Sequence, residues 1–524
     1  MKFSLKTYLP IIVALAIVLG MYMGQNLNFP DQKEYKSSSK QKFTKFIDYI
    51  DESYVDEVNT DSIVELTLKS VLDQLDPHSS YISQQEYSLV HDEMRGGFVG
   101  IGVSFYHIGD SLAVIRTIEN GPSDKAGLLP GDRIVEADGV DLSSSVVSDS
   151  ITKLLKGEKN TNVRLKVKRF DQEKLLSFDV KRDQVPLKSV DATYLLNDTT
   201  AYVKINRFSE TTYSEFKGRM QKMPQEKIKS IVLDLRNNTG GYLQEATQIA
   251  DEFLKEDQLI VFTKNKDGDL NKRYAKSGGA YEDAEIFVLI NEKTASASEV
   301  IAGAIQDNDR GTIIGRRSFG KGLVQREMQL GDGSAVRLTV ARYYTPTGRS
   351  IQRSYENGSK DYFSSYLKRY ANGELQNADS IHVDESKKFT TPQGKIVYGG
   401  GGIIPDIFIP INETQTSKDL KFMFEGGAMS RFIFTQMDKD RAYFNHLNEK
   451  QFLTGDLITY EIVNDFENYL GDFSMTYDFS SSVDEAKIYL KATMAQQIFD
   501  DNLAYKIINQ SDPMLQKITE LKTE

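Results

Sequence analysis

The sequence predicts a multidomain protein of mixed α+β class, and three observations lead to that prediction. The chain has 524 residues, 40% of them hydrophobic, which is enough to bury more than one core and fits two to four domains. Short alternating strands punctuated by glycine fill residues 96–182, whereas strands and helices alternate from about residue 186. Helical periodicity dominates from about residue 412 to the end.

Composition excludes several classes of function. The net charge is −11 and the pI is about 5.3, which argues against a nucleic-acid binder, because such proteins usually carry a basic field that neutralises phosphates. The chain has no cysteine, so a thiol nucleophile, a disulfide framework, Cys-ligated zinc and iron–sulfur clusters are all excluded.

The N-terminus has the pattern of a targeting segment or a membrane anchor. Lys2 and Lys6 precede an apolar run from Leu9 to Gly24, which as a helix would span roughly 24 Å, against ~30 Å of hydrocarbon core. The stretch after it, Met21–Gln25, lacks the small-x-small pattern of a cleavage site. We therefore expect residues 1–29 to be a signal anchor, with a removed signal peptide as the alternative.

Residues 30–95 read as a linker followed by a helical segment. The polar stretch 30–42 is typical of a solvated linker. Two apolar faces with helical spacing follow, made by Phe43, Phe46, Ile47, Ile50 and Tyr54, and then by Ile63, Leu66, Leu68, Val71, Leu72 and Leu75. The sequence Leu-Asp-Pro-His-Ser-Ser-Tyr at 75–81 ends the second helix.

Residues 96–182 form a small β-rich module, with strands expected at 102–106, 112–117 and 163–167. Its centre, residues 121–139, closely resembles PDZ domains, down to the Ala-Gly-Leu short helix and the Gly-Asp-Arg-Ile strand start. In that family a glycine-rich loop binds a peptide's C-terminal carboxylate, and a free strand edge pairs with the peptide. The resemblance places peptide binding on Val99, Gly100, Ile101, Gly102 and Val103; a plain β-turn is the alternative for this loop.

From about residue 186 the pattern becomes α/β. Strands are expected at 201–205, 231–233, 259–262 and 286–290, separated by helices such as 213–223 and 243–254. After Gly322 the apolar period switches to two, with a turn at 331–333. Residues 355–398 are polar and are expected to be an irregular insertion, and residues 412–524 a helical region.

One motif imitates a nucleotide-binding loop. Residues 315–321, Gly-Arg-Arg-Ser-Phe-Gly-Lys, match the first seven positions of a phosphate-binding P-loop. Gly322 then stands where a magnesium-binding Ser or Thr is required, and the next residues alternate as a strand where that loop needs a helix. These two departures argue against an NTPase.

Ser296 has the surroundings of a nucleophile. It lies between an apolar strand that ends near Asn291 and a run at 298–305 that predicts a helix. Free N–H groups and the positive end of the dipole at a helix N-terminus favour an oxyanion. The alternative is that Thr294, Ser296 and Ser298 are simply candidates for helix capping.

Lys321 is the candidate base for Ser296. Gln325 follows it by four residues, so on an extended chain both side chains point to one face, and a desolvated lysine can lose its proton. The five histidines are His78, His91, His107, His382 and His446, so none lies between residues 107 and 382, where the catalytic-looking motifs fall. A local Ser–His pair is therefore unsupported, although spacing alone leaves His107 and His382 open.

Taken together, these motifs resemble the C-terminal processing peptidases, also called tail-specific proteases. The match runs from residue 43 to 352 plus Gly-Gly-Gly-Gly-Ile-Ile-Pro-Asp at 399–406, with the motifs in family order: Leu-Asp-Pro-His-Ser at 75–79, the PDZ module, Asp-Leu-Arg-Asn-Asn-Thr-Gly-Gly at 234–241, Thr-Ala-Ser-Ala-Ser-Glu at 294–299 and Phe-Gly-Lys-Gly-Leu-Val-Gln at 319–325. One departure is Thr239, where many members have proline.

The resemblance implies roles for individual residues. Ser296 would be the nucleophile, Lys321 the general base and Gln325 the residue that positions the lysine. The oxyanion hole would fall on the backbone N–H groups of Gly241 and Ala297. It also implies a crotonase-like α/β core at 183–411, and it implies no metal or other cofactor.

We therefore expect a serine endopeptidase of the bacterial envelope, anchored on the periplasmic side of the inner membrane. It would cut proteins or peptides near their C-termini after the PDZ domain has captured the tail, and by resemblance the PDZ domain would also gate activity. Its partners would be these substrates and the membrane, with no nucleic acid; a homodimer is allowed and any adaptor is unidentified. The rival functions are a noncatalytic PDZ scaffold with a degenerate core and, less favoured, the NTPase.

Overall fold

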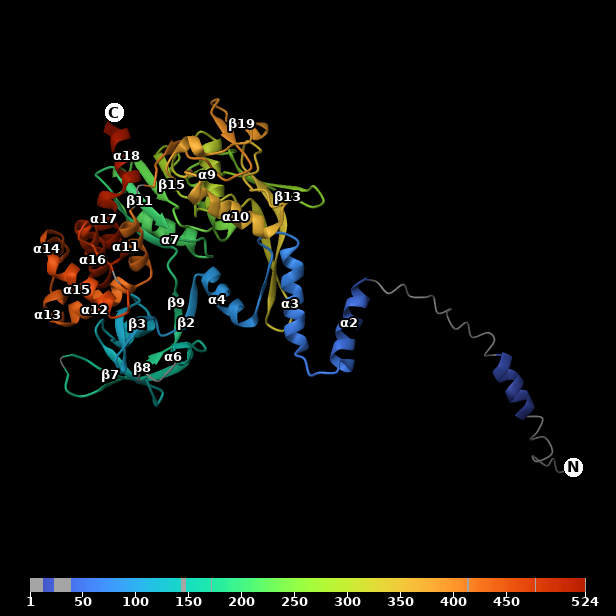
Figure 1. Cartoon of the computed structure of the whole chain (residues 1–524). Coiled ribbons are helices and arrows are strands. Elements are labelled where there is room, and N and C mark those ends of the chain that lie inside the picture. The colour runs from blue at the N-terminus through green and yellow to red at the C-terminus, as the bar shows by residue number, and fades with distance from the viewer. Residues whose placement is uncertain are drawn as a thin grey trace. The chain divides into compact units, whose positions relative to one another are not determined.

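The computed structural model describes residues 13–22, 39–142, 148–170, 172–411, 414–475 and 477–523 (Figure 1). The chain divides into two compact units, Met1–Val71 and Leu72–Glu524. The boundary between the two units falls inside residues 30–95, which the sequence analysis grouped as one segment.

The first unit is helical where it is described. Residues 13–22 form a helix, and α2 (Ser39–Ser53) and most of α3 (Thr60–Asp73) follow. The Asn59 side chain accepts a hydrogen bond from the N–H of Ser62 at the start of α3. The rest of the expected anchor, residues 1–12 and 23–29, lies outside the described residues. Within the described ranges, no helix combines the length and the apolar character needed to cross a membrane.

The expected β-rich module is an antiparallel sheet in the order β3-β4-β5-β7-β8, with β6 paired to β5. Its core is made by alternate residues; on β7 these are Val163, Leu165 and Val167, all fully buried. In the described residues β3 pairs only with β4, so its other edge is free. The elements are β3 (Val103–Ile108), β4 (Ser111–Thr117), α5 (Pro122–Ala126), β5 (Arg133–Ala137), β6 (Val140–Asp141), α6 (Ser148–Leu155), β7 (Asn162–Lys168) and β8 (Leu176–Lys181).

The catalytic-looking motifs lie on a six-stranded sheet in the order β10-β11-β12-β15-β16-β21. All neighbours are parallel except β10 against β11. Continuous apolar runs such as Ile286–Ile290 are typical of parallel strands that are covered on both faces. The strands are β10 (Val190–Leu195), β11 (Thr200–Ile205), β12 (Ser230–Asp234), β15 (Glu285–Ile290), β16 (Thr312–Gly315) and β21 (Ile407–Phe408).

Helices cover both faces of this sheet. On one face Phe216 of α7 (Thr212–Gln221), Ile249 of α8 (Leu243–Asp251) and Ile301 of α9 (Ala297–Asp307) join the main apolar core. On the other face the contacts come from α18 (Pro513–Thr523), whose Met514 and Leu515 pack against the sheet. The last helix of the chain is therefore part of the core that supports the sheet.

A second sheet lies beside the first and contributes the lysine motif. Its order is β1-β18-β13-β14, with β17 also paired to β18. The short strand β1 follows the Leu-Asp-Pro-His-Ser motif and pairs with the start of β18. The strands are β1 (Ser80–Ile82), β13 (Leu259–Asn265), β14 (Leu270–Tyr274), β17 (Leu323–Gln329) and β18 (Ala335–Tyr344).

The C-terminal region is helical, as expected, and appears in orange and red in Figure 1. Its own core contains Phe432, Phe452, Phe466 and Phe479. The helices are α11 (Gln415–Glu425), α12 (Ala428–Asp438), α13 (Arg441–Asn445), α14 (Glu449–Thr454), α15 (Tyr460–Gly471), α16 (Val483–Ile498), α17 (Asp501–Ile508) and α18.

One segment adds to the sequence prediction and another differs from it. Within the expected helical segment 30–95, a further helix, α4 (Gln84–Arg95), follows the break at 75–81 and begins with a Ser83 capping box. The insertion 355–398 is ordered rather than irregular: it contains the fourteen-residue helix α10 (Gly358–Ala371) and the hairpin of β19 (Lys388–Thr390) and β20 (Ile396–Tyr398). Its polar composition conceals a buried face that includes Tyr362 and Arg369.

Candidate active site

Ser296 lies where the chain passes from β15 into α9. Thr294 and Ser298, which the sequence offers as helix caps, instead tie this loop to the loop that follows β12. The Thr294 hydroxyl donates to the Leu235 carbonyl at 2.9 Å, and the Ser298 hydroxyl donates to the Asn238 carbonyl at 3.0 Å. Two neighbouring parallel strands therefore place their C-terminal loops together, which is the usual position of a site in an open α/β sheet.

The backbone of Ser296 is strained. Its φ is 57° and its ψ is −116°, outside the regions that non-glycine residues ordinarily adopt. Such conformations cost roughly 1–3 kcal/mol and concentrate at functional sites. The next residue, Ala297, begins α9, so the strained conformation lies at the N-terminus of that helix, where the helix dipole is positive.

Gly240 approaches Ser296 closely, and the next residue, Gly241, lies against the backbone of Phe208. The φ of Gly240 is +103°, and a Cβ added there would lie 2.8 Å from Ser296 Cβ and 3.0 Å from Ala297 N. The buried Asn238 fixes this loop, because its side chain accepts from Gly240 N at 2.9 Å. Neither Gly241 nor Ala297 donates its N–H to another described residue, so the two predicted oxyanion donors are both present and both free.

A buried cluster of charged side chains lies at the start of the same loop. Asp234, at the end of β12, accepts hydrogen bonds from Tyr202 and Arg236 and pairs with Lys204. Burial raises the pKa of Asp234, but Arg236 and Lys204 outweigh it and hold that pKa well below its usual value. Arg236 also pairs with Asp512 at 2.6 Å, which connects the loop to the C-terminal helices.

Lys321 and Gln325 are in contact, as predicted. Lys321 Nζ donates to Gln325 Oε1 at 2.8 Å. A β-bulge lies between Val324 and Gln325, so simple alternation along a strand does not by itself explain the shared face. Burial, with help from the charge of Arg337, lowers the pKa of Lys321 to about 8, which makes the neutral amine available near physiological pH.

Glu299 joins the serine and lysine segments. Its fully buried carboxylate accepts from the main-chain N–H groups of Ser296 at 2.8 Å, Gly320 at 2.7 Å and Lys321 at 2.9 Å. The Ser318 hydroxyl donates to it as well. Burial raises the pKa of Glu299, while these four donors act in the opposite direction. The sequence interpretation assigned Glu299 no role, although an acidic residue inside an apolar helix was a usable signal.

Tyr343 and the Gly-rich motif at 399–406 complete the support. The hydroxyl of the buried Tyr343 lies 3.0 Å from the Ser296 carbonyl and 2.7 Å from the Lys321 carbonyl. From the motif, Ile403 N donates to the Ser318 hydroxyl at 2.6 Å and its carbonyl accepts from Ser318 N at 2.9 Å. The loop that imitates a P-loop is thus held between the glycine motif and Glu299, and it continues into a strand rather than a helix.

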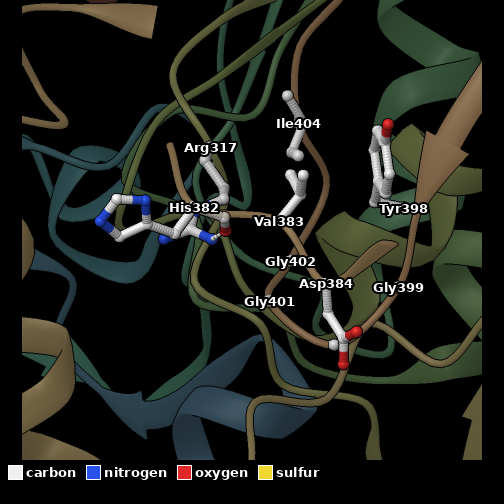
Figure 2. Close-up of a pocket in the computed structure, with 10 residues that line it drawn as sticks. Arg317, His382, Val383, Asp384, Tyr398, Gly399, Gly401, Gly402 and Ile404 are labelled. Atoms are coloured by element: carbon white, nitrogen blue, oxygen red, sulfur yellow. Dashed lines mark hydrogen bonds between the residues drawn. The ribbon is translucent and has the colours of Figure 1, made fainter. Parts of the chain in front are cut away.

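Of the five histidines, His78 lies nearest to this group. Its carbonyl accepts from Gln325 Nε2. His107 belongs to β3, where its ring contacts the Leu142 carbonyl at 3.1 Å. His382 lines a separate cavity of about 260 Å³ with Arg317, Tyr398 and the glycines 399–402, which Figure 2 shows. None of the predicted catalytic residues lines that cavity, and Arg317 is already paired with Glu374.

The predicted peptide-binding loop is shorter than expected. Val99 and Gly100 belong to the strand β2 (Gly97–Gly100), which pairs with β9 (Asp183–Pro186). Ile101 and Gly102 alone connect β2 to β3, with Gly102 at a φ of +71° and Val103 first in β3. The Ile101 carbonyl accepts from Ser123 N at 2.9 Å, which packs the loop on α5.

Comparison with known proteins places this site in a family. Residues 199–358 match the model of peptidase family S41, and residues 99–181 match that of the PDZ domain. The carboxy-terminal-processing protease of Bartonella bacilliformis is 35% identical over 326 residues, which cover 62% of this chain and 74% of that protein. The chain belongs to peptidase family S41.

A second curated relative agrees with this assignment, and one solved structure is also similar to this chain. The carboxy-terminal processing protease CtpB of Bacillus subtilis is 29% identical, over 70% of this chain and 78% of its own. A solved photosystem II D1 C-terminal processing protease is 24% identical, with a TM-score of 0.37 and coverage of 70% of this chain and 86% of that one. The S41 chain is therefore a serine peptidase of the carboxy-terminal processing type with a PDZ domain, and the predicted multidomain fold is confirmed in those parts.

Proposed function

We propose that this S41 peptidase hydrolyses peptide bonds with Ser296 as nucleophile and Lys321 as general base. The observation that carries the proposal is the shared carboxylate of Glu299, which binds the backbone of both residues and so fixes the two segments against each other. A Ser–Lys pair needs a neutral amine, and Lys321 has a pKa lowered to about 8 by burial.

The reaction would be acyl transfer in two steps. Neutral Lys321 takes the hydroxyl proton of Ser296 as its oxygen attacks the peptide carbonyl, and the oxyanion accepts hydrogen bonds from Gly241 N and Ala297 N. The peptide C–N bond then breaks, and the protonated lysine gives its proton to the leaving amine. Water, deprotonated by the same lysine, attacks the acyl-enzyme; the ester C–O bond breaks, the lysine returns its proton to Ser296 Oγ, and the carboxylic acid product leaves.

Substrate selection would depend on the PDZ domain. The free edge of β3 can pair with an extended peptide, and the short turn at 101–102 places backbone N–H groups at the end of that edge, where a terminal carboxylate would bind. We infer that the substrates are proteins or peptides with an accessible C-terminus, cut near that end. A substrate with an amidated C-terminus, otherwise identical, is the matched control, and equal cleavage of both forms would contradict this part of the proposal.

We also propose that the enzyme works in the bacterial envelope, on the periplasmic side of the inner membrane. The support is the N-terminal sequence, in which two lysines precede the apolar run 9–24. Fractionation of cells that produce the full chain, compared with a chain lacking residues 1–29, tests this. Recovery of the full chain in the soluble cytosolic fraction would refute it.

The catalytic assignment is tested by covalent labelling. A fluorophosphonate probe should label Ser296, identified by peptide mass spectrometry, and Ser296→Ala should abolish both labelling and hydrolysis of fluorescein-labelled casein. Lys321→Ala should lower turnover by about a thousandfold or more while far-ultraviolet circular dichroism stays unchanged. Absence of labelling in the wild-type protein would instead favour the noncatalytic PDZ scaffold.

A further inference from the structure

The turn at residues 76–79 is held by the side chain of Asp76. One carboxylate oxygen accepts from His78 N at 2.8 Å and Ser79 N at 2.9 Å, and the other accepts from the Ser79 hydroxyl at 2.6 Å. Asp76 is 7% exposed and Ser79 is 5% exposed, so the turn is a buried element rather than a surface loop. Three hydrogen bonds to one buried carboxylate fix the direction of the carbonyl groups between them.

This turn is docked on the strands that carry Gln325. Residues Ser80–Ile82 pair with Ala335–Arg337 of β18. Thr339, the register partner of Gln325, donates its N–H to the Ser79 hydroxyl at 3.1 Å. A segment almost 250 residues upstream is thus anchored directly opposite the amide that contacts Lys321.

The His78 carbonyl determines which way the Gln325 amide faces. A carboxamide has an accepting oxygen and a donating NH₂ group at nearly the same positions, and rotation by half a turn exchanges them. The His78 carbonyl can only accept, so it binds Nε2, which leaves Oε1 facing Lys321 Nζ at 2.8 Å. In the opposite orientation, Gln325 Oε1 would face the His78 carbonyl oxygen, and the Gln325 NH₂ group would face the N–H groups of Lys321.

We propose that Asp76 is a positioning residue of the active site: it fixes the turn whose His78 carbonyl orients Gln325, and through Gln325 it holds Lys321. This inference rests on the roles of Ser296 and Lys321 proposed above. It adds to them a residue of the Leu-Asp-Pro-His-Ser segment, which the sequence interpretation treated as the end of a helix and as a family motif without a role for any of its residues.

The His78 ring gives the same backbone a second attachment. Its Nε2 lies 2.9 Å from the Tyr362 hydroxyl on α10, and the two rings make an edge contact with centroids 5.2 Å apart. Burial, and then the nearby charge of Lys321, lowers the pKa of His78 to about 4, so the imidazole is neutral in the working range. A neutral ring adds no positive charge beside the lysine, and α10 secures the far side of the turn.

A positioning role and a merely structural role give different results in a double-mutant cycle. We would measure fluorophosphonate labelling of Ser296 in the full chain, separating the maximal rate kinact from the binding constant KI, for wild type, Asp76→Ala, Gln325→Ala and the double variant. The measurements are made at about pH 9, above the pKa of Lys321. Lys321 is then mostly neutral, so a change in its pKa on loss of the Asp76 charge has little effect on the rate.

We expect Asp76→Ala to lower kinact by about tenfold with KI unchanged, because misplacement of a catalytic group mainly affects the chemical step. In the Gln325→Ala background the same substitution should change kinact by less than about twofold, since no amide remains to be oriented. Asp76→Asn, which keeps an acceptor for the two N–H groups, should restore most of the rate.

Losses that multiply in the double variant, or a kinact for Asp76→Ala equal to that of wild type, would overturn the inference. If Asp76→Ala does not fold, Ser79→Ala removes one donor and one acceptor of the same turn and enters the cycle in its place. Failure of the proposed function is recognised separately, because the wild-type protein would then not be labelled at Ser296 at all.

Discussion

Ser296 and Lys321 donate their main-chain N–H groups to the same atom, Oε2 of Glu299, at 2.8 and 2.9 Å. The two residues belong to different loops, one after β15 and one after β16. A single buried acceptor therefore sets the separation of the two loops, and any shift of Glu299 moves both. The other oxygen, Oε1, accepts from Gly320 N at 2.7 Å and from the Ser318 hydroxyl.

Substitution of Glu299 should impair activity and stability together. Glu299→Ala leaves four buried donors without an acceptor, at about 1–3 kcal/mol each, so a loss of several kcal/mol in unfolding free energy is expected. Glu299→Gln keeps one acceptor oxygen but turns an NH₂ group toward N–H donors, and should be intermediate. Denaturant unfolding and Ser296 labelling measure the two effects, and wild-type values in Glu299→Ala would contradict the shared-acceptor interpretation.

The pH dependence should follow the deprotonation of Lys321. Because the active form is the neutral amine and its pKa is lowered to about 8, kcat/KM should rise with pH through that value and level off above it. At pH 7 about a tenth of the enzyme would carry the neutral lysine. The charged groups that act on this pKa are Arg337, Glu299 and Asp76. A profile that is flat from about pH 6 to pH 10 would exclude lysine as the base.

Substitution of Arg337 tests the direction in which a neighbouring charge shifts the pKa of Lys321. Its charge lowers the pKa of Lys321, so Arg337→Gln should raise that pKa and move the rising limb to higher pH. The side chain is partly exposed and pairs with Glu327 at 2.6 Å, so its removal should change stability little. A limb that moves to lower pH would show that the electrostatic account of Lys321 is wrong.

Gly240→Ala should damage catalysis through steric displacement. The new Cβ would lie 2.8 Å from Ser296 Cβ and 2.9 Å from the Ala295 carbonyl, at a φ of +103°. The loop must then move away from Ser296 and carry Gly241 N with it, and loss of one oxyanion donor costs about a hundredfold or more in kcat. Gly218→Ala, where nothing lies within 4 Å of the added Cβ, is the matched control and should retain full activity. Normal turnover by Gly240→Ala would place the oxyanion hole elsewhere.

The sequence predicted the elements of the site better than the contacts between them. Ser296, Lys321 and Gln325 could be named as candidates because their motifs are local, and local spacing is what a sequence shows directly. The contacts of Glu299 and of the turn that Asp76 holds were missed because they are buried hydrogen bonds to segments distant in the chain, from Lys321 N to Glu299 and from Thr339 N to the Ser79 hydroxyl. No periodicity records such contacts.

The prediction that residues 355–398 are irregular failed for a related reason. Its polar composition suggested loop, yet α10 buries Arg369 against Glu374 and against the carbonyls of Arg317 and Ser318. A buried arginine with satisfied partners counts as polar in a sequence and as core in the structure. The predicted peptide-binding loop included residues that belong to a strand, because the pairing of β2 with β9 is a contact between the two ends of the module.

The C-terminal helices, to which the sequence interpretation assigned no role, pack against the PDZ domain. Phe434 of α12 is fully buried against Ala113 and Ile115 of β4. The guanidinium groups of Arg133 and Arg441 lie over its ring, 5.2 and 4.6 Å from the centroid. These contacts use the face of β4 that points away from the core of the PDZ domain, so they leave the free edge of β3 available to a peptide.

Phe434→Ala should therefore loosen the PDZ domain while the peptidase core keeps its stability. Removal of a buried phenylalanine costs about 3–5 kcal/mol, and here the cost falls on the contact between α12 and β4. Hydrogen–deuterium exchange should accelerate in Ser111–Thr117 and stay slow in Ser230–Asp234, because β12 packs elsewhere. Phe422→Ala is the matched control, since Phe422 lies on α11 with 73% of its surface exposed, and its exchange pattern should equal that of wild type. If Phe434→Ala left exchange in β4 unchanged, the PDZ domain would be held by its own core and the connections to residues 97–100 and 183–186 alone.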